Sequence, residues 1–89
     1  MNFKDLHLTH IFPNPANDVL DIDLSNYKNQ AVDIYLYNNL GQQKLYDKVE
    51  NATNALLELD VSALPSGSYM VRLVSKGKRE LTKPVIITH

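Results

Sequence analysis

Apolar and polar residues alternate with a period of two over most of this chain, and no stretch has the 3.6-residue period of an amphipathic helix. Successive side chains of a strand point to opposite faces, so each alternating stretch predicts a strand with one buried face. The alternation therefore predicts an all-β fold. Its apolar members are the expected core: Leu20, Ile22, Leu24, Val32, Ile34, Leu36, Ala55, Leu57, Leu59, Val61, Tyr69, Val71 and Leu73.

Turn-forming sequences separate the alternating stretches. "NNLG" at 38–41, "ENATN" at 50–54 and "SKGKRE" at 75–80 are rich in residues that favour turns. A first strand is expected around Leu6 and Leu8, and a last one from Leu81 to Thr88. With about seven short strands, the pattern is typical of an immunoglobulin-like antiparallel sandwich.

The stretch "LPSGSYMVRL" at 64–73 joins a polar break directly to an alternating strand. Immunoglobulin-like sandwiches have a tyrosine near the start of the penultimate strand, whose hydroxyl bonds back to the backbone upstream. Tyr69 fits that corner. Pro65 stops the preceding strand, and we expect Gly67 to supply backbone dihedrals that a tight reversal needs.

A second break, "FPNP" at 12–15, brackets Asn14 between two prolines. Pro13 and Pro15 cannot donate to a strand ladder, so the chain is expected to leave one sheet edge here and to re-enter a sheet at Val19.

Composition narrows the class of protein. A chain of 89 residues is one domain, here residues 6–89 behind a short extension of residues 1–5. The net charge of −1 gives no general attraction to nucleic acid or to an anionic bilayer, and the absence of cysteine excludes disulfides and thiolate metal sites. No nucleophile and base at plausible spacing and no phosphate loop appear, so we expect neither catalysis nor a cofactor.

The first ten residues contain no apolar stretch of signal-peptide length, and nothing in the chain approaches a membrane span. We therefore expect a domain cut from a larger protein, with any export signal elsewhere in that protein.

Four blocks carry a family resemblance: "PNPANDVLDI" at 13–22, "VDIYLYNNLGQQ" at 32–43, "LPSGSYMVRL" at 64–73 and "TKPVIITH" at 82–89. In this order the chain resembles the type A C-terminal sorting domain of the Bacteroidetes type IX secretion system. The resemblance implies a non-catalytic sandwich that directs a periplasmic cargo protein through the outer membrane. It implies as partners the outer-membrane secretion machinery, a surface sortase and the upstream cargo, and export to the cell surface or medium; self-association is left open.

The resemblance also assigns residues. It implies structural roles for the first three blocks and recognition by the secretion machinery for the last, where Pro84 and the tail Thr88–His89 depart from the family pattern. The structural set is Pro13, Asn14, Pro15, Ala16, Asn38, Gly41, Pro65, Gly67 and Tyr69. The recognised set is Lys83, Val85, Ile86 and Ile87, with Val85 and Ile87 expected to face the core, Ile86 expected outside, and an unpaired strand edge open to strand addition.

Other interpretations stay open beside this one. A fibronectin-like or carbohydrate-binding accessory domain is the main alternative, because Tyr35, Tyr37 and Tyr46 could form a sugar-binding patch; we expect cross-strand pairs instead. A solvated strand face is expected for Asp18, Asp21 and Asp23 rather than a calcium site. No metal site is expected from His7, His10 and His89, and the glycosylation-like triplet at 51–53 reads equally well as a turn.

Overall fold

The computed structural model describes residues 9–52 and 56–89. Within those ranges it contains seven strands and one 3-10 turn, η2 (Ser25–Tyr27). None of the helical structure in this part of the chain is long and apolar enough to cross a membrane. The strands are β1 (Ile11–Phe12), β2 (Val19–Asp23), β3 (Val32–Asn38), β4 (Gln43–Val49), β5 (Leu56–Asp60), β6 (Gly67–Val74) and β7 (Leu81–Ile87).

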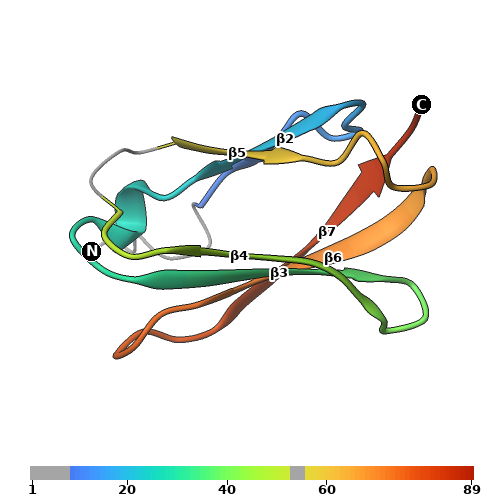
Figure 1. Cartoon of the computed structure of the whole chain (residues 1–89). Helices are drawn as coiled ribbons and strands as arrows, with labels where there is room; N and C mark the ends of the chain where they lie inside the picture. The colour runs from blue at the N-terminus through green and yellow to red at the C-terminus, as the bar shows by residue number, and fades with distance from the viewer. Residues whose placement is uncertain (1–8, 53–55) are drawn as a thin grey trace, which may run out of the picture.

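The strands form two antiparallel sheets packed face to face (Figure 1). One sheet has the order β1-β2-β5 and the other the order β4-β3-β6-β7. Placing the fourth strand beside the third is a known variation of the immunoglobulin-like sandwich. The predicted all-β sandwich is confirmed. The strand expected at Leu6 and Leu8 lies outside the described residues, and the first observed strand, β1, follows directly after them.

The core lies between the sheets and is built by the alternation. The inward residues of β2, β3 and β6 are almost completely buried, as predicted, and Tyr27 of η2 joins them. Leu59 and Val61 are buried and Leu57 is half-buried, whereas Ala55 lies outside the described residues. β2 begins at Val19, where the chain was expected to re-enter a sheet after its two prolines.

The corner before β6 is closed by Tyr69. Its ring is buried, and its hydroxyl donates to the Pro65 carbonyl oxygen at 2.6 Å. This confirms the predicted tyrosine corner. The expectation for Gly67 is wrong: its φ lies outside the left-handed region, because Gly67 already begins the extended strand β6. A β-carbon added there would lie 3.8 Å from Tyr69 Cε1, an ordinary contact.

The turn between β3 and β4 behaves as predicted. Gly41 has a φ of +81°, and Asn38 Oδ1 accepts hydrogen bonds from the backbone N–H groups of Leu40 (2.9 Å) and Gln42 (3.0 Å). The Asn38 side chain therefore caps the turn, and Gly41 supplies the conformation that other residues adopt with difficulty.

Two glycine substitutions separate these roles. We expect Gly41→Ala to lower the free energy of unfolding by about 1 kcal/mol, because alanine is strained at positive φ. Gly67→Ala should change it by less than about 0.5 kcal/mol, because its backbone is accessible to alanine and its surroundings accept the methyl group. Urea denaturation of both variants measures the difference. A loss at position 67 as large as that at position 41 would contradict the assignment.

Candidate recognition site at the terminal strand

β7 is the last strand of the four-stranded sheet and pairs antiparallel with β6 (Figure 1). Val85 and Ile87 point into the core and are 1% and 0% exposed, whereas Ile86 is 46% exposed on the outer face. The predicted orientations of these three residues are confirmed. Ile86 is therefore the large apolar side chain that the terminal block exposes to solvent.

Lys83 does not lie beside Ile86. It occupies an odd-numbered position of β7, on the same side as Val85 and Ile87, and is half-buried. A flat partner surface laid on the outer face would contact Ile86 and Pro84 but not the Lys83 stem. The structure thus divides the predicted recognition residues between two faces of one strand.

The outer edge of β7 is occupied from Pro84 to Thr88. The Ile86 N–H donates to Asn14 Oδ1 at 2.9 Å, and the Ile86 carbonyl oxygen accepts from the Ala16 N–H at 2.8 Å. The Thr88 N–H donates to the Ala16 carbonyl oxygen at 2.8 Å, and a longer contact of 3.5 Å joins Asn14 Nδ2 to the Pro84 carbonyl oxygen. We call residues 14–16 the edge clasp. The expected unpaired edge is therefore wrong for this part of the strand.

The clasp lies within the proline-rich block. The Phe12–Pro13 and Asn14–Pro15 peptide bonds are cis, and Ala16 is fully buried, where it bridges to Ile87 in parallel. A small side chain at this position lets the backbone approach β7 closely. The block at 13–22, which was predicted to interrupt strand pairing at its prolines, thus also pairs with strand β7.

The tail beyond β7 is held as well. The His89 N–H donates to Ser66 Oγ at 3.0 Å, and His89 Nε2 lies 2.7 Å from the Leu64 carbonyl oxygen. His89 Nδ1 lies 3.1 Å from Asn17 Oδ1 and 3.9 Å from Asp18 Oδ1. Because a carbonyl oxygen only accepts, Nε2–H is the donor in the contact with Leu64. The tail joins the block at 13–22 to the block at 64–73.

Two shallow depressions flank Tyr69 at this end of the sandwich. One, of about 270 Å³, is mainly apolar and is lined by Asn39, Ser68, Tyr69, Met70, Pro84, Val85 and Ile86. The other, of about 230 Å³, is lined by Asn38, Asn39, Lys44, Pro65, Ser66, Gly67, Ser68 and Tyr69. Residues of the second, third and fourth sequence blocks therefore line this surface, and the first block reaches the adjoining strand β7 through the edge clasp. Its chemistry suits contact with another protein: apolar side chains surrounded by amides and hydroxyls.

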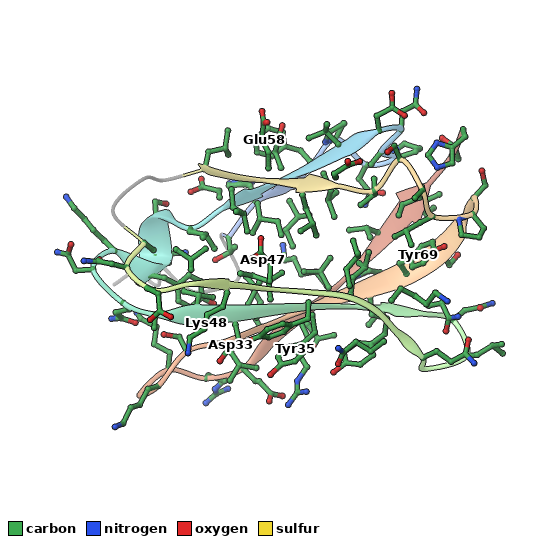
Figure 2. The ribbon with its side chains drawn as sticks, in the orientation of Figure 1. Asp33, Tyr35, Asp47, Lys48, Glu58 and Tyr69 are labelled. Carbon is green, nitrogen blue, oxygen red and sulfur yellow. The ribbon has the colours of Figure 1, made fainter. Side chains whose placement is uncertain are left out.

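A tyrosine cluster covers the middle of the same sheet, on its outer face, where Figure 2 labels Asp33 and Tyr35. Tyr35 pairs across strands with Tyr46, with ring centroids 5.1 Å apart, and stacks on Tyr37 at 6.1 Å. The Arg72 guanidinium lies 5.2 Å from the Tyr35 ring centroid and donates to the Tyr37 hydroxyl at 3.1 Å. The predicted cross-strand pairing is confirmed for Tyr35 and Tyr46.

The polar groups of this cluster satisfy one another. Arg72 forms an ion pair with Glu80, which lowers the pKa of Glu80 and raises that of Arg72. The Tyr46 hydroxyl donates to Asp33 Oδ1 at 2.7 Å, and this hydrogen bond is the main cause that raises the pKa of Tyr46 to about 12. These side-chain contacts connect strands β3, β4 and β6 on the outer face of the sheet.

This shift predicts a pH effect above neutrality. The pKa of Tyr46 is higher in the folded state than its ordinary value of 10.0, so its contribution to stability is complete below pH 10 and is lost as the pH rises towards about 12. Comparing the unfolding free energies of wild type and Tyr46→Phe over that range should reveal a gap that closes with rising pH. A gap that stays constant would contradict the hydrogen bond to Asp33.

The acidic and histidine residues form no metal site within residues 9–52 and 56–89. Asp21 and Glu58 oppose each other across β2 and β5 on the outer face of the three-stranded sheet, where Figure 2 labels Glu58. His10 is exposed, and His89 serves the tail contacts; His7 and Thr53 lie outside the described residues. Asp18 is exposed and Asp23 is half-buried, consistent with the predicted solvated face. The prediction is wrong for Asp21, whose Oδ1 is buried without a hydrogen-bond partner among the described residues.

Sequence reasoning missed the edge clasp and the tail contacts. Asn14 and Ile86 are 72 residues apart, and His89 and Ser66 are 23 apart, so no local periodicity connects them. The family resemblance singled out the right blocks without indicating that they touch.

A family model described as the secretion system C-terminal sorting domain matches residues 10–88. No curated protein and no solved structure gives a match. The matched span includes all seven strands and the four sequence blocks apart from the final residue. The chain therefore belongs to the family of secretion-system C-terminal sorting domains, the sorting signals of type IX secretion.

Proposed function

We propose that this domain directs a larger cargo protein from the periplasm through the outer membrane, and that a surface sortase then removes the domain and attaches the cargo. The observation that carries the proposal is the convergence of the four family blocks on the surface around β7. A short linear signal would not need contacts from residues 14–18 and 64–66 to hold its last strand and tail. We infer that the folded domain is the signal.

The proposed mechanism is recognition without chemistry. Ile86 offers an exposed apolar contact beside the depression that Met70 and Pro84 help to line. Val85 and Ile87 act by anchoring the strand in the core. Lys83 lies on the opposite face of β7 and would add a positive charge outside the exposed patch.

The roles of Lys83 and Ile86 are tested with a fluorescent reporter that carries its own periplasmic signal peptide and ends in residues 1–89. We expect Ile86→Ala to reduce the reporter found on the surface or in the medium strongly, and Lys83→Ala to reduce it less, because Ile86 belongs to the exposed patch and Lys83 lies on the opposite face of β7. The purified variants must first match wild type in urea denaturation. Wild-type export by both stable variants would show that recognition lies elsewhere on the domain.

A further inference from the structure

The backbone groups of β7 are accounted for on both sides. The backbone N–H and carbonyl groups of Ile86 point to the outer edge of the sheet, away from β6. Because these groups alternate in direction along a strand, those of the odd-numbered residues point to β6, in the register Gly67↔Ile87, Tyr69↔Val85 and Val71↔Lys83. The backbone groups of the even-numbered residues point to the outer edge. There the N–H and carbonyl groups of Ile86 and the N–H of Thr88 are bound by the clasp, at distances of 2.8 to 2.9 Å.

Pro84 completes this closure. It stands at an outward-facing position and has no N–H, so the ladder with β6 loses no donor and the edge offers none. Its carbonyl oxygen is in reach of Asn14 Nδ2 at 3.5 Å. Between Pro84 and Thr88 an added strand would therefore find its hydrogen-bonding positions already taken.

The side chains of the same strand remain accessible. Ile86 is 46% exposed and Met70, which precedes Val71 on the neighbouring strand, is 39% exposed. Both line the apolar depression on the outer face. The terminal strand thus displays its outer side chains and hides its backbone, the reverse of what strand addition requires.

We propose that Asn14 is a positioning residue for recognition: its side-chain amide binds the Ile86 N–H and completes the closed edge of β7 that the Ala16 backbone begins, so that the secretion partner reads this strand by its outer face, through Ile86, and not by strand addition. The inference rests on the proposed function. Asn14 itself is exposed and contacts β7 with its side chain alone, so it can be changed without disturbing the core.

Two substitutions at position 14 separate its contributions. Asn14→Leu removes the amide, whereas Asn14→Asp keeps an oxygen that can accept from the Ile86 N–H. Asn51→Leu is the matched control, since Asn51 is another exposed asparagine, in the connection that follows β4. Asn14→Ala removes the amide without adding bulk and replaces Asn14→Leu if that variant folds poorly.

Hydrogen exchange of the purified domains measures the closure. Losing this hydrogen bond should speed exchange of the Ile86 amide by roughly fivefold to tenfold in Asn14→Leu, while the Val71 amide within the sheet keeps its wild-type rate. Asn14→Asp and Asn51→Leu should retain the slow Ile86 rate. An unchanged Ile86 rate in Asn14→Leu would show that Asn14 does not close the edge.

Export of the reporter fusion measures the consequence. We expect Asn14→Leu to lower export severalfold and Asn14→Asp to restore it, because face recognition needs Ile86 held in place. If Asn14→Leu opens the edge and exports as well as or better than wild type, the partner uses the edge and the inference is wrong. If the wild-type fusion is not exported at all, the proposed function fails, while the exchange rates still decide whether Asn14 closes the edge.

Discussion

Replacing Ile87 with alanine is expected to lower the free energy of unfolding by about 2–5 kcal/mol, whereas the same change at Ile86 should cost less than about 1 kcal/mol. Ile87 is completely buried between the sheets, so truncation leaves a cavity that the surrounding side chains fill only in part. Ile86 is nearly half exposed and its truncation leaves no enclosed cavity. Ile87 therefore contributes to the stability of the core, whereas the neighbouring Ile86 contributes little to stability and is exposed.

Urea denaturation with a common slope measures both losses. Val85→Ala is a useful companion, because Val85 faces the same core and should also be costly. Equal losses at positions 86 and 87 would mean that β7 is not seated in the sandwich as described. The result also guides export experiments, because a failure of Ile87→Ala to export would be explained by unfolding.

Removing the hydroxyl group from each of two buried tyrosines is expected to change the free energy of unfolding in different directions. Tyr69→Phe should cost about 0.5–1.5 kcal/mol, because it removes the hydroxyl that donates to the Pro65 carbonyl oxygen. Tyr27→Phe should be neutral or stabilising by up to about 1 kcal/mol, because the buried Tyr27 hydroxyl has no hydrogen-bond partner among the described residues. Burial raises the pKa of Tyr27, and the nearby Thr9 hydroxyl offsets this only in part.

Each substitution removes one oxygen and leaves the ring in place, so packing changes little in either variant. Paired thermal and urea denaturation of the two proteins gives the sign of each effect. A cost for Tyr27→Phe as large as that for Tyr69→Phe would indicate that the Tyr27 hydroxyl is hydrogen-bonded to the Thr9 hydroxyl. An unchanged midpoint for Tyr69→Phe would count against the corner.

The alternation predicted the core because strand geometry ties sequence position to a face. Leu20 and Ile22, or Val71 and Leu73, lie two positions apart and are buried together for that reason alone. The corner was predictable because Tyr69 and Pro65 are four residues apart and proline constrains the chain locally. Features decided within a few residues were accessible from the sequence.

The errors have a different origin. Gly67 was expected to adopt an unusual φ because it lies in a turn-like sequence, but the strand begins there and pairing with β7 makes its backbone extended. The open edge was expected because β7 ends the sequence, whereas Asn14 and Ala16 approach it from the opposite end of the chain. Pairing between distant segments decided both outcomes, and alternation carries no information about it.

Export of a reporter ending in residues 1–89 decides whether the folded domain acts as a type IX sorting signal. The reporter, with its own periplasmic signal peptide, is produced in a bacterium with a working type IX system and in a matched strain that lacks the system. We predict reporter on the surface or in the medium of the first strain, and in the periplasm of the second. Reporter retained in the periplasm of both strains, or exported equally by both, would contradict the claim.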